Sequence, residues 1–241
     1  KITVDSARFS ADWDKLIASK GLPLSTPNEV SIYHLAKALS EKCKVTLTGE
    51  GADEIFGGYV QPQFSAYDLE RQLERAAVNQ YEFENSPFAM ALILLYGRAN
   101  FIDDTDHYLA TSTWLSYTER AALFREDAWD SIGQDGPVFE FYADFFDKLD
   151  KCSIFDRRMH LFAEFNLESL LFRIDNSTMA ASVEARVPFT DYRLSELAFT
   201  MPDEYKMWWK DSESMEKGAN LIASAIDAKD LITTKRLPRM A

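Results

Sequence analysis

The sequence is poor in the residues that build disulfide frameworks and metal sites. It contains two cysteines and three histidines among 241 residues. Cys43 and Cys152 lie far apart and neither belongs to a Cys-x-x-Cys pair. This argues against a disulfide framework or a zinc ribbon and indicates a reducing compartment. His34, His107 and His160 are equally dispersed, so we interpret them as ordinary helix or loop histidines and not as metal ligands.

Positive charge and long apolar runs are also scarce. The net charge is −13 and the 39 acidic residues are scattered, so no basic stripe is present to neutralise the phosphates of a nucleic acid. The longest apolar stretch, Phe88–Tyr96, is far shorter than the roughly 20 residues that a bilayer requires, and it predicts a buried core helix. We therefore expect a cytoplasmic protein with neither a nucleic-acid partner nor a membrane partner.

Apolar residues are abundant. They make up 46% of the chain, and 13% of all residues are aromatic, which is enough for one large core or for a core with a helical appendage. The first residues, KITV, have the composition of a strand, and no initiating Met or signal segment precedes them. We expect the chain to be part of a longer polypeptide, and the basic ending TTKRLPRMA supports the same expectation.

The first sixty residues have the order of an α/β layer. A helix is predicted from about Ser10 to Ala18, and a capping box formed by Thr26 and Glu29 starts a second helix over about Pro27–Glu41. The short apolar run Lys44–Leu47 predicts a parallel strand covered on both faces. An acidic glycine loop follows at once, where α/β proteins bind ligands at the carboxyl ends of parallel strands.

Helical patterns dominate the rest of the chain. Amphipathic spacing continues through most of residues 64–173, with another capping box at Ser116 and Glu119 and a loop at Ile132–Pro137. Almost no alternating β pattern appears between Tyr59 and Arg173. The predicted fold class is therefore α/β passing into mainly α, with residues 1–60 as the end of an α/β layer and residues 61–241 as a mostly helical part.

The loop TLTGEGADEIFGGY combines glycines with carboxylates. Gly49, Gly51, Gly57 and Gly58 permit positive φ and let backbone N–H groups approach an anion. Carboxylates beside a phosphate repel it unless a cation lies between them, so Asp53 is predicted to hold Mg²⁺ against phosphate oxygens. The loop thus favours a magnesium nucleotide, with an ordinary turn as the alternative. It matches neither the Walker P-loop nor the Rossmann fingerprint.

A second unusual stretch, RIDNSTMAASVEARVPFTDYRL, alternates charges with small residues. A helix is predicted over about Asn176–Ala185, which would place Glu184 where the helix must stop before Pro188. Glu184 and Arg186 are then expected to be partly buried, and a buried carboxylate needs a partner. A purely structural ion-pair network is the alternative interpretation.

Together the two stretches resemble the synthetase domain of the glutamine-hydrolysing asparagine synthetase family. That family carries L-S-G-E-G-A-D-E-x-F-x-G-Y, followed later by S-M-x-x-S-x-E-A-R-V-P-F-L-D, and this chain carries LTGEGADEIFGGY and STMAASVEARVPFTD in the same order. The resemblance spans about Pro23–Pro202. It implies the C-terminal portion of an adenine-nucleotide α-hydrolase-like domain, the PP-loop ATP pyrophosphatase fold.

The resemblance also implies roles for residues of the glycine loop. Thr48 and Gly49 take the place of the Ser-Gly pair that contacts ATP, with Gly51 in the same nucleotide-binding loop. Asp53 takes the position that binds magnesium and pyrophosphate. Glu50 matches the acidic residue proposed to act on the nucleophile, where lactam-forming relatives carry Tyr.

Two further catalytic positions lie outside this loop. Glu184 matches the carboxylate that pairs with the tyrosine of the lactam-forming relatives, and Lys217 matches a lysine that steadies charge on the reacting phosphate. The Arg that the family carries four residues after this lysine is Leu221 here.

The implied reaction needs ATP, Mg²⁺, aspartate or a related acid, and ammonia derived from glutamine. The family's S-G-G-x-D-S loop and its cysteine glutaminase domain are missing from this sequence, and the resemblance places both upstream of Lys1. We therefore expect the isolated fragment to be inactive or slow.

The alternatives are a specialised amidotransferase or lactam-forming relative of exopolysaccharide, antibiotic or peptide biosynthesis, and a non-catalytic interaction module. A homodimer is left open.

Overall fold

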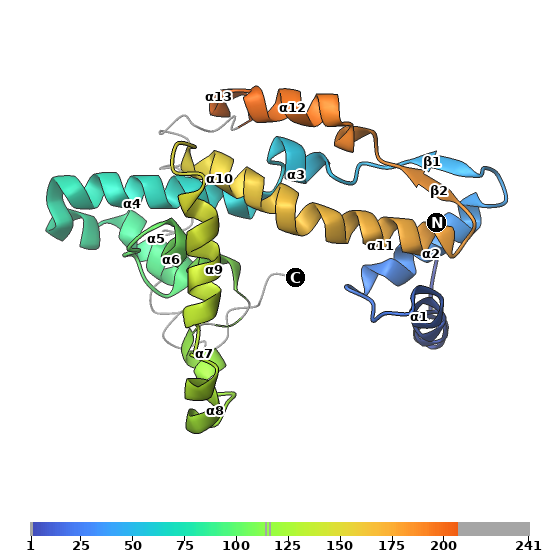
Figure 1. Ribbon diagram of the computed structural model, residues 1–241, viewed down its shortest axis with the longest axis horizontal. Helices are drawn as coiled ribbons and strands as arrows, with labels where there is room; N and C mark the ends of the chain where they lie inside the picture. Colours follow the sequence, from blue (N-terminus) through green and yellow to red (C-terminus); the bar gives the residue numbers. More distant parts are fainter. Residues whose placement is uncertain (1, 114, 116, 207–241) are drawn as a thin grey trace. The chain divides into compact units, whose positions relative to one another are not determined.

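The computed structural model describes residues 2–113, 115 and 117–206. They form two compact units. In the described part the first unit takes residues 2–60 and 158–202, and the second takes residues 61–157 and 203–206 (Figure 1). Helices dominate these residues, and the sheet found among them has two short parallel strands. The expected mixture of parallel strands and a large helical region is therefore confirmed.

The first unit contains both unusual sequence stretches. Its elements are α1 (Ser6–Lys20), α2 (Asn28–Leu39), β1 (Val45–Leu47), α3 (Ala52–Phe56), the π-helical turn η1 (Phe162–Asn166), α11 (Leu167–Met179), β2 (Glu184–Arg186), the 3-10 turn η2 (Pro188–Thr190) and α12 (Tyr192–Thr200).

Helix α1 starts earlier than the sequence pattern predicts. The side chain of Asp5 accepts a hydrogen bond from Arg8 N at 2.8 Å, so it caps the helix ahead of Ser6. At the other end Gly21 adopts φ = 70° and closes the last turn onto Ile17 O. The strand expected at KITV is wrong, because residues 2–5 have no strand to pair with in the described part of the chain.

Helix α2 is fastened by a buried acid at its first turn. Glu29 accepts hydrogen bonds from Ser25 N and Thr26 N, at 2.5 and 3.3 Å, and lies 3.2 Å from the ammonium of Lys20. The second of these bonds is the reach-back half of the predicted capping box. The Thr26 hydroxyl bonds to Asn28 instead, so the box is only half formed.

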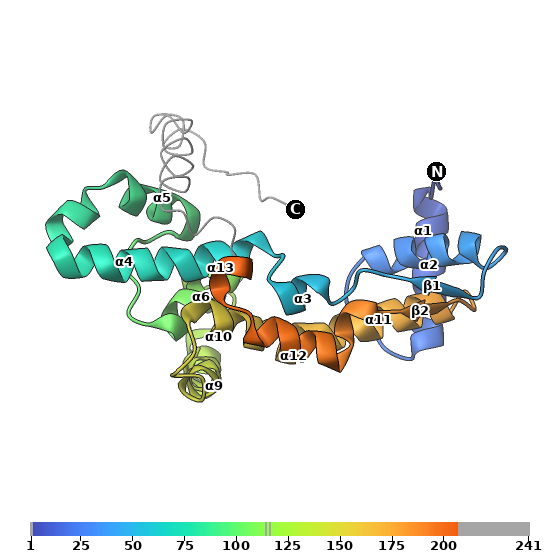
Figure 2. The same cartoon turned by 90° about the horizontal axis from the view of Figure 1, so that it is seen from above.

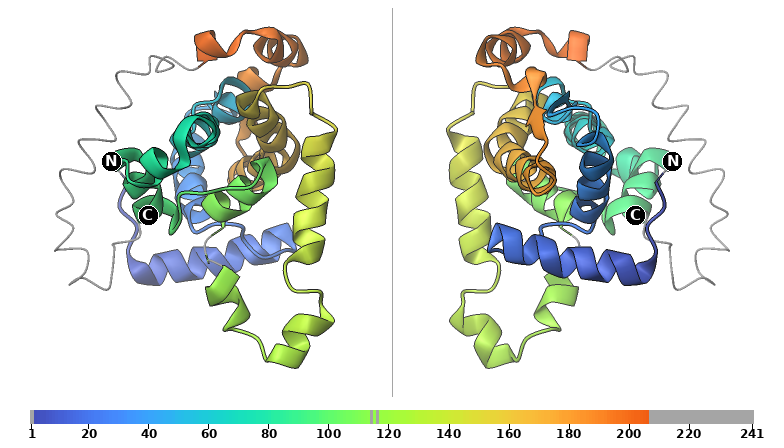
Figure 3. Two further views of the ribbon diagram at one scale, coloured as in Figure 1. Left: turned by 90° about the vertical axis from the view of Figure 1, so that its left-hand side faces the viewer. Right: turned by 90° about the vertical axis from the view of Figure 1, so that its right-hand side faces the viewer.

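The core of the first unit lies where α1 and α2 cross. Leu16, Val30 and Tyr33 are its buried members, with Trp13 and Ala180 among the side chains packed against them. Figures 2 and 3 show that α1 crosses α2 at a steep angle. Val30 and Tyr33 of α2 therefore face the core, as helical periodicity predicts, whereas Leu39 at the end of the helix is 37% exposed.

The sheet pairs β1 with β2 in parallel, with Val45 opposite Glu184 and Leu47 opposite Arg186. Both strands lie over the carboxyl-terminal end of α11 (Figure 2). The expectation that β1 is covered on both faces is wrong, since the exposed fractions of Val45 and Leu47 are 48% and 74%. In the described part of the chain, helix α11 and strand β2 leave much of β1 open.

The predicted helix over 176–185 is also wrong. Helix α11 ends at Met179, and Ser182 adopts φ = 59°, which turns the chain before β2 begins at Glu184. Val183 is fully buried and anchors this turn. The small residues Ala180 and Ala181, which favour a helix locally, instead let the chain pack closely on the α1–α2 core.

The second unit is built from helices, as predicted. They are α4 (Val60–Glu84, with a non-helical break at Asn79), α5 (Pro87–Tyr96), α6 (Asp104–Ser112), α7 (Tyr117–Ala121), α8 (Glu126–Ser131), α9 (Gly136–Asp147), α10 (Ile154–Leu161, whose last residues are counted with the first unit) and α13 (Asp203–Lys206).

The apolar run Phe88–Tyr96 lies in α5, which is capped by Ser86 and ended by Gly97 at φ = 80°. Its Ala89 and Leu92 join Leu69, Phe83, Ala99 and Phe101 in the core of this unit. The capping box expected at Ser116 lies outside the described residues. None of the helices in the described ranges is both long and apolar enough to cross a membrane.

Candidate active site

The glycine loop leaves the carboxyl end of β1 and is fixed by Thr48. Its backbone N–H donates to Arg186 O at 2.9 Å, which extends the pairing with β2 by one residue. Its Oγ1 accepts a hydrogen bond from Glu50 N at 3.0 Å. A hydroxyl that accepts in this way still has its own hydrogen to donate. Thr48 can therefore shape the loop and donate to a ligand oxygen at the same time.

Gly51 is the glycine on which this loop depends most. It adopts φ = +88°, and a β-carbon there would lie 2.4 Å from Thr190 Cγ2 and 3.2 Å from Leu167 Cδ1. Gly57 also has positive φ, at 71°. Gly49 and Gly58 do not use the positive φ that glycine permits, so their backbone conformations are open to other residues. The close approach of Thr190 and Leu167, together with its positive φ, explains why position 51 is a glycine better than anion binding alone does.

Asp53 lies in the first turn of α3 with its side chain exposed. Its carboxylate rests against Gly58 and makes no ion pair within the described ranges. No cluster of three or more His, Cys, Asp or Glu side chains suited to a metal was found among the described residues. An open, unpaired carboxylate is what Mg²⁺ uses when water and phosphate supply its other ligands, so Asp53 fits the predicted role.

Glu54, the neighbouring acid, is buried. Its exposed fraction is 1%, and Oε1 accepts a hydrogen bond from the phenol of Tyr59. Tyr59 packs on Phe162 with 5.4 Å between the ring centroids. Burial, together with the Glu54 carboxylate, raises the pKa of Tyr59 above its ordinary value, so the phenol stays a donor. Glu54 therefore ties the end of α3 to η1 and is not available to a ligand.

Glu50 forms an ion pair with Arg173 of α11. The distance from Glu50 Oε1 to Arg173 Nη2 is 2.9 Å, and the exposed fractions of the two side chains are 21% and 13%. Oε2 of Glu50 has no hydrogen-bond or ion-pair partner within the described ranges. Arg173 Nε is buried and likewise lacks a hydrogen-bond partner there. Sequence reasoning missed this pairing, although Arg173 opens the charge-rich stretch.

The helix that carries Arg173 is preceded by the π-helical turn η1. Leu167 N donates to Phe162 O, the wide hydrogen bond of a π-helical turn. Such turns occur often at functional sites, because they shift the faces of a helix relative to one another. Here Leu167 is the side chain that lies beside Gly51.

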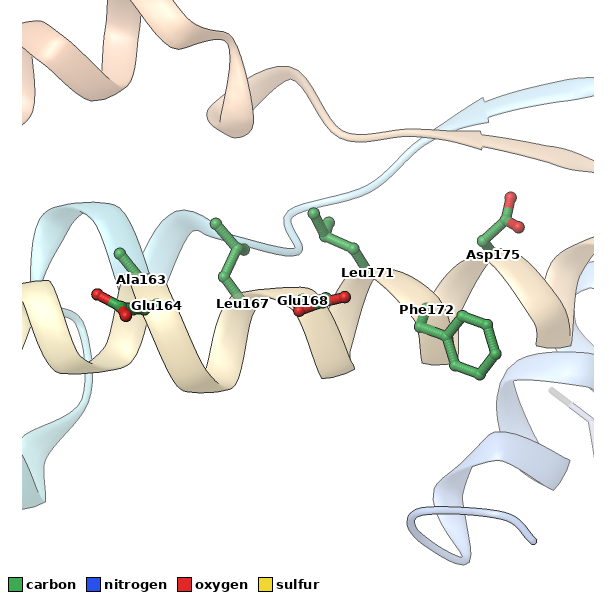
Figure 4. A pocket seen from close by; sticks show the side chains of 7 residues that line it. All are labelled: Ala163, Glu164, Leu167, Glu168, Leu171, Phe172 and Asp175. Carbon is green, nitrogen blue, oxygen red and sulfur yellow. The ribbon is translucent and has the colours of Figure 1, made fainter. Parts of the chain in front are cut away.

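A shallow groove of about 590 Å³ runs along η1 and α11. Figure 4 shows its lining, which alternates apolar and acidic side chains: Ala163, Glu164, Leu167, Glu168, Leu171, Phe172 and Asp175. Leu167 belongs to the groove and also touches the site of Gly51, so the groove adjoins the glycine loop.

Glu184 lies at the opposite end of the sheet. It starts β2 opposite Val45, whereas Glu50 follows the end of β1. Its side chain is 47% exposed and forms an ion pair with Arg186, itself 63% exposed, at 2.7 Å. The expected partial burial of both residues is therefore wrong, since a two-stranded sheet leaves their side chains in the open. The structure does not bring Glu184 beside Glu50, and its catalytic role stays a prediction.

The sequence model of the family described as asparagine synthase matches residues 1–215. The chain belongs to the asparagine synthase family. The resemblance inferred from the two motifs is thus confirmed. The matched range includes the glycine loop, α11 and β2, and it ends before Lys217, which lies outside the described residues.

Two relatives in this family come from Bacillus subtilis (strain 168). Asparagine synthetase [glutamine-hydrolyzing] 1 is 26% identical over 194 residues, which cover 76% of this chain and 29% of that protein. Asparagine synthetase [glutamine-hydrolyzing] 3 is 25% identical over 236 residues, which cover 93% of this chain and 31% of that protein. The chain therefore spans about 30% of the length of these asparagine synthase family members.

Proposed function

We propose that the protein forms an amide from a carboxylate with ATP. The carboxylate, most simply that of aspartate, attacks the α-phosphorus of ATP and releases pyrophosphate. Ammonia derived from glutamine then displaces AMP and gives asparagine. Membership of the asparagine synthase family supports this proposal. The observation that carries it is the different setting of the three loop acids: Glu50 is paired with Arg173, Asp53 is exposed with no ion-pair partner among the described residues, and Glu54 is buried.

The nucleotide site is proposed to lie at the carboxyl end of β1. Thr48, Gly49 and Gly51 would contact ATP, and Asp53 would hold Mg²⁺, which offsets the repulsion between two reacting anions. The position of the loop after a parallel strand supports the proposed PP-loop fold, because ligands bind at such edges. Lys217 is proposed to add positive charge beside the phosphates.

Glu50 is proposed to act in the second step. Ammonia becomes positively charged as it adds to the activated carboxyl carbon, and a carboxylate can take up the proton. General-base catalysis of this kind contributes about 10²–10⁴ in rate. Partial burial of Glu50 strengthens its interaction with a cation relative to a fully exposed acid. Glu184, at the start of β2, is proposed as a second carboxylate that takes part in the same step.

The test uses the complete gene product. Purified protein is incubated with ATP, Mg²⁺ and single amino or organic acids, and AMP, pyrophosphate and amide are measured with ammonia or glutamine as the nitrogen source. We expect AMP and amide to form in equal amounts with aspartate. Release of AMP with another acid would reassign the substrate, and ADP formation or no turnover with any acid would contradict the proposed chemistry.

A further inference from the structure

The two oxygens of Glu50 have different surroundings. Oε1 is taken by Arg173 Nη2 at 2.9 Å, and Oε2 is without a partner in the part of the chain that the structure describes. We propose that Arg173 is a positioning residue that holds Oε1, so that Oε2 is the oxygen that meets the incoming ammonia. This inference rests on the proposed function and assigns a residue that the two sequence motifs do not.

Arg173 suits this task because it comes from a more rigid element than Glu50 does. Glu50 lies on a loop, where its side chain has several rotatable bonds, whereas Arg173 projects from the middle of α11. The backbone of Glu50 is fixed by a hydrogen bond that its N–H donates to Thr48 Oγ1 at 3.0 Å. The guanidinium then fixes the far end of the side chain. Sites supported from helices hold their geometry better than sites supported from loops.

The cost of the arrangement also points to a task beyond stability. Arg173 is nearly buried, and its Nε has no hydrogen-bond partner among the described residues. Leaving a buried donor unsatisfied destabilises a protein, and a buried ion pair is often no more stabilising than an apolar pair of the same volume. A pair selected only for stability would satisfy that donor or avoid the charges.

The step can be written with its atoms in balance. The nitrogen of ammonia forms a bond to the carboxyl carbon of the acyl-adenylate, and one of its protons passes to Glu50 Oε2. The C–O bond to AMP breaks, and AMP leaves with that electron pair. Arg173 touches none of the reacting atoms. It acts by keeping Oε2 turned toward the nitrogen.

The test separates the two half-reactions in the complete gene product. Arg173→Met and Arg173→Lys are compared with wild type for acid-dependent ATP–pyrophosphate exchange and for ammonia-dependent amide formation. We expect Arg173→Met to lower kcat/KM for ammonia by about 100-fold, the scale of a 1 Å misplacement, while exchange stays close to wild type. Arg173→Lys should recover part of the loss, because it keeps the charge. In a Glu50→Gln background Arg173→Met should add no further loss.

Arg193→Met is the matched control. Arg193 lies in the same charge-rich stretch and pairs with Asp191, but the pair is exposed, with side-chain fractions of 74% and 39%. Its loss should leave both half-reactions unchanged. Unchanged amide formation in Arg173→Met, parallel loss of both half-reactions, or full additivity with Glu50→Gln would overturn the inference. Failure of wild type to form any amide would instead overturn the proposed function.

Discussion

The carboxylate of Asp53 fills the space that a side chain at position 58 would need, so that position is a glycine. A β-carbon at position 58 would fall 1.9 Å from Asp53 Oδ1 and 2.9 Å from Asp53 Cγ. The backbone of Gly58 does not have positive φ, so its lack of a side chain serves the carboxylate and not the turn. The rotamer of the proposed magnesium ligand thus depends on its glycine neighbour.

Gly58→Ala should therefore weaken metal dependence while preserving the fold. The methyl group displaces the end of a flexible side chain, so we expect the Mg²⁺ concentration for half-maximal activity to rise by at least about tenfold, as for other residues that orient a ligand. Titration of ATP–pyrophosphate exchange with Mg²⁺ measures this. Gly136→Ala is the control, since nothing lies within 4 Å of a β-carbon there. An equal response of the two variants would contradict the prediction.

Gly51→Ala should destabilise the protein through two separate effects. Positive φ costs about 1–2 kcal/mol for a residue with a β-carbon, and contact with Thr190 adds about 1–3 kcal/mol of overpacking. Gly21→Ala isolates the first effect, because its φ is +70° with nothing within 4 Å. Denaturant unfolding of both variants measures the difference. A smaller loss for Gly51→Ala than for Gly21→Ala would refute the assignment of the clash.

Tyr59→Phe should leave the buried Glu54 carboxylate without its hydrogen-bond donor. We expect the free energy of unfolding to fall by about 1–3 kcal/mol. Because the pKa of Tyr59 is raised, the donor is retained throughout the neutral range, and the loss should not vary with pH there. Adding Glu54→Gln to Tyr59→Phe removes the buried charge and should restore part of the stability. Equal stability of wild type and Tyr59→Phe would show that the bond is unimportant.

The buried pair Asp68 and Tyr96 predicts a pH-dependent stability of the helical unit. Tyr96 Oη donates to Asp68 Oδ2 at 2.8 Å, and burial raises the pKa of Asp68 from 3.8 to about 7. Between these values the folded protein keeps a proton that the unfolded chain has lost, so stability falls as pH rises through this window, by up to about 4 kcal/mol.

Asp68→Asn should abolish this slope and stabilise the protein at and above neutral pH. Its amide is neutral and can still accept the hydrogen bond from Tyr96. Denaturant unfolding across the window from 3.8 to about 7 tests both statements. His107 packs edge-on against Tyr96, with 6.1 Å between ring centroids, and is present in both proteins. An unchanged pH slope in Asp68→Asn would assign the dependence to another group.

Local signals predicted the parts of the fold that are governed by local interactions. A capping box predicted α2, the apolar run Phe88–Tyr96 predicted α5, and periodicity predicted the helical character of the second unit, because these signals act within a turn or two of the chain. They failed at residues 176–185. There the choice between helix and strand depends on pairing with β1 and on burial of Val183, which no local pattern contains.

The same distinction holds for the site. The loop residues Thr48, Glu50 and Asp53 stand out by their spacing, and the structure adds a hydrogen bond from Tyr59 to Glu54, five residues earlier. Arg173 was missed as the partner of Glu50, because an ion pair between distant segments leaves no trace in one sequence. The exposure of Glu184 and Arg186 was missed because it depends on how few elements cover the two-stranded sheet, which the local sequence does not show.

The Glu50–Arg173 contact joins residues that are 123 positions apart in the chain. The parallel pairing of β1 with β2 spans the same long segment. During synthesis the glycine loop leaves the ribosome long before either partner exists, so its final shape must wait until α11 and β2 have emerged. Closing so long a loop is entropically costly and slow. The order of translation thus keeps the loop from acquiring the geometry seen in the structure until the segment between β1 and β2 has been made.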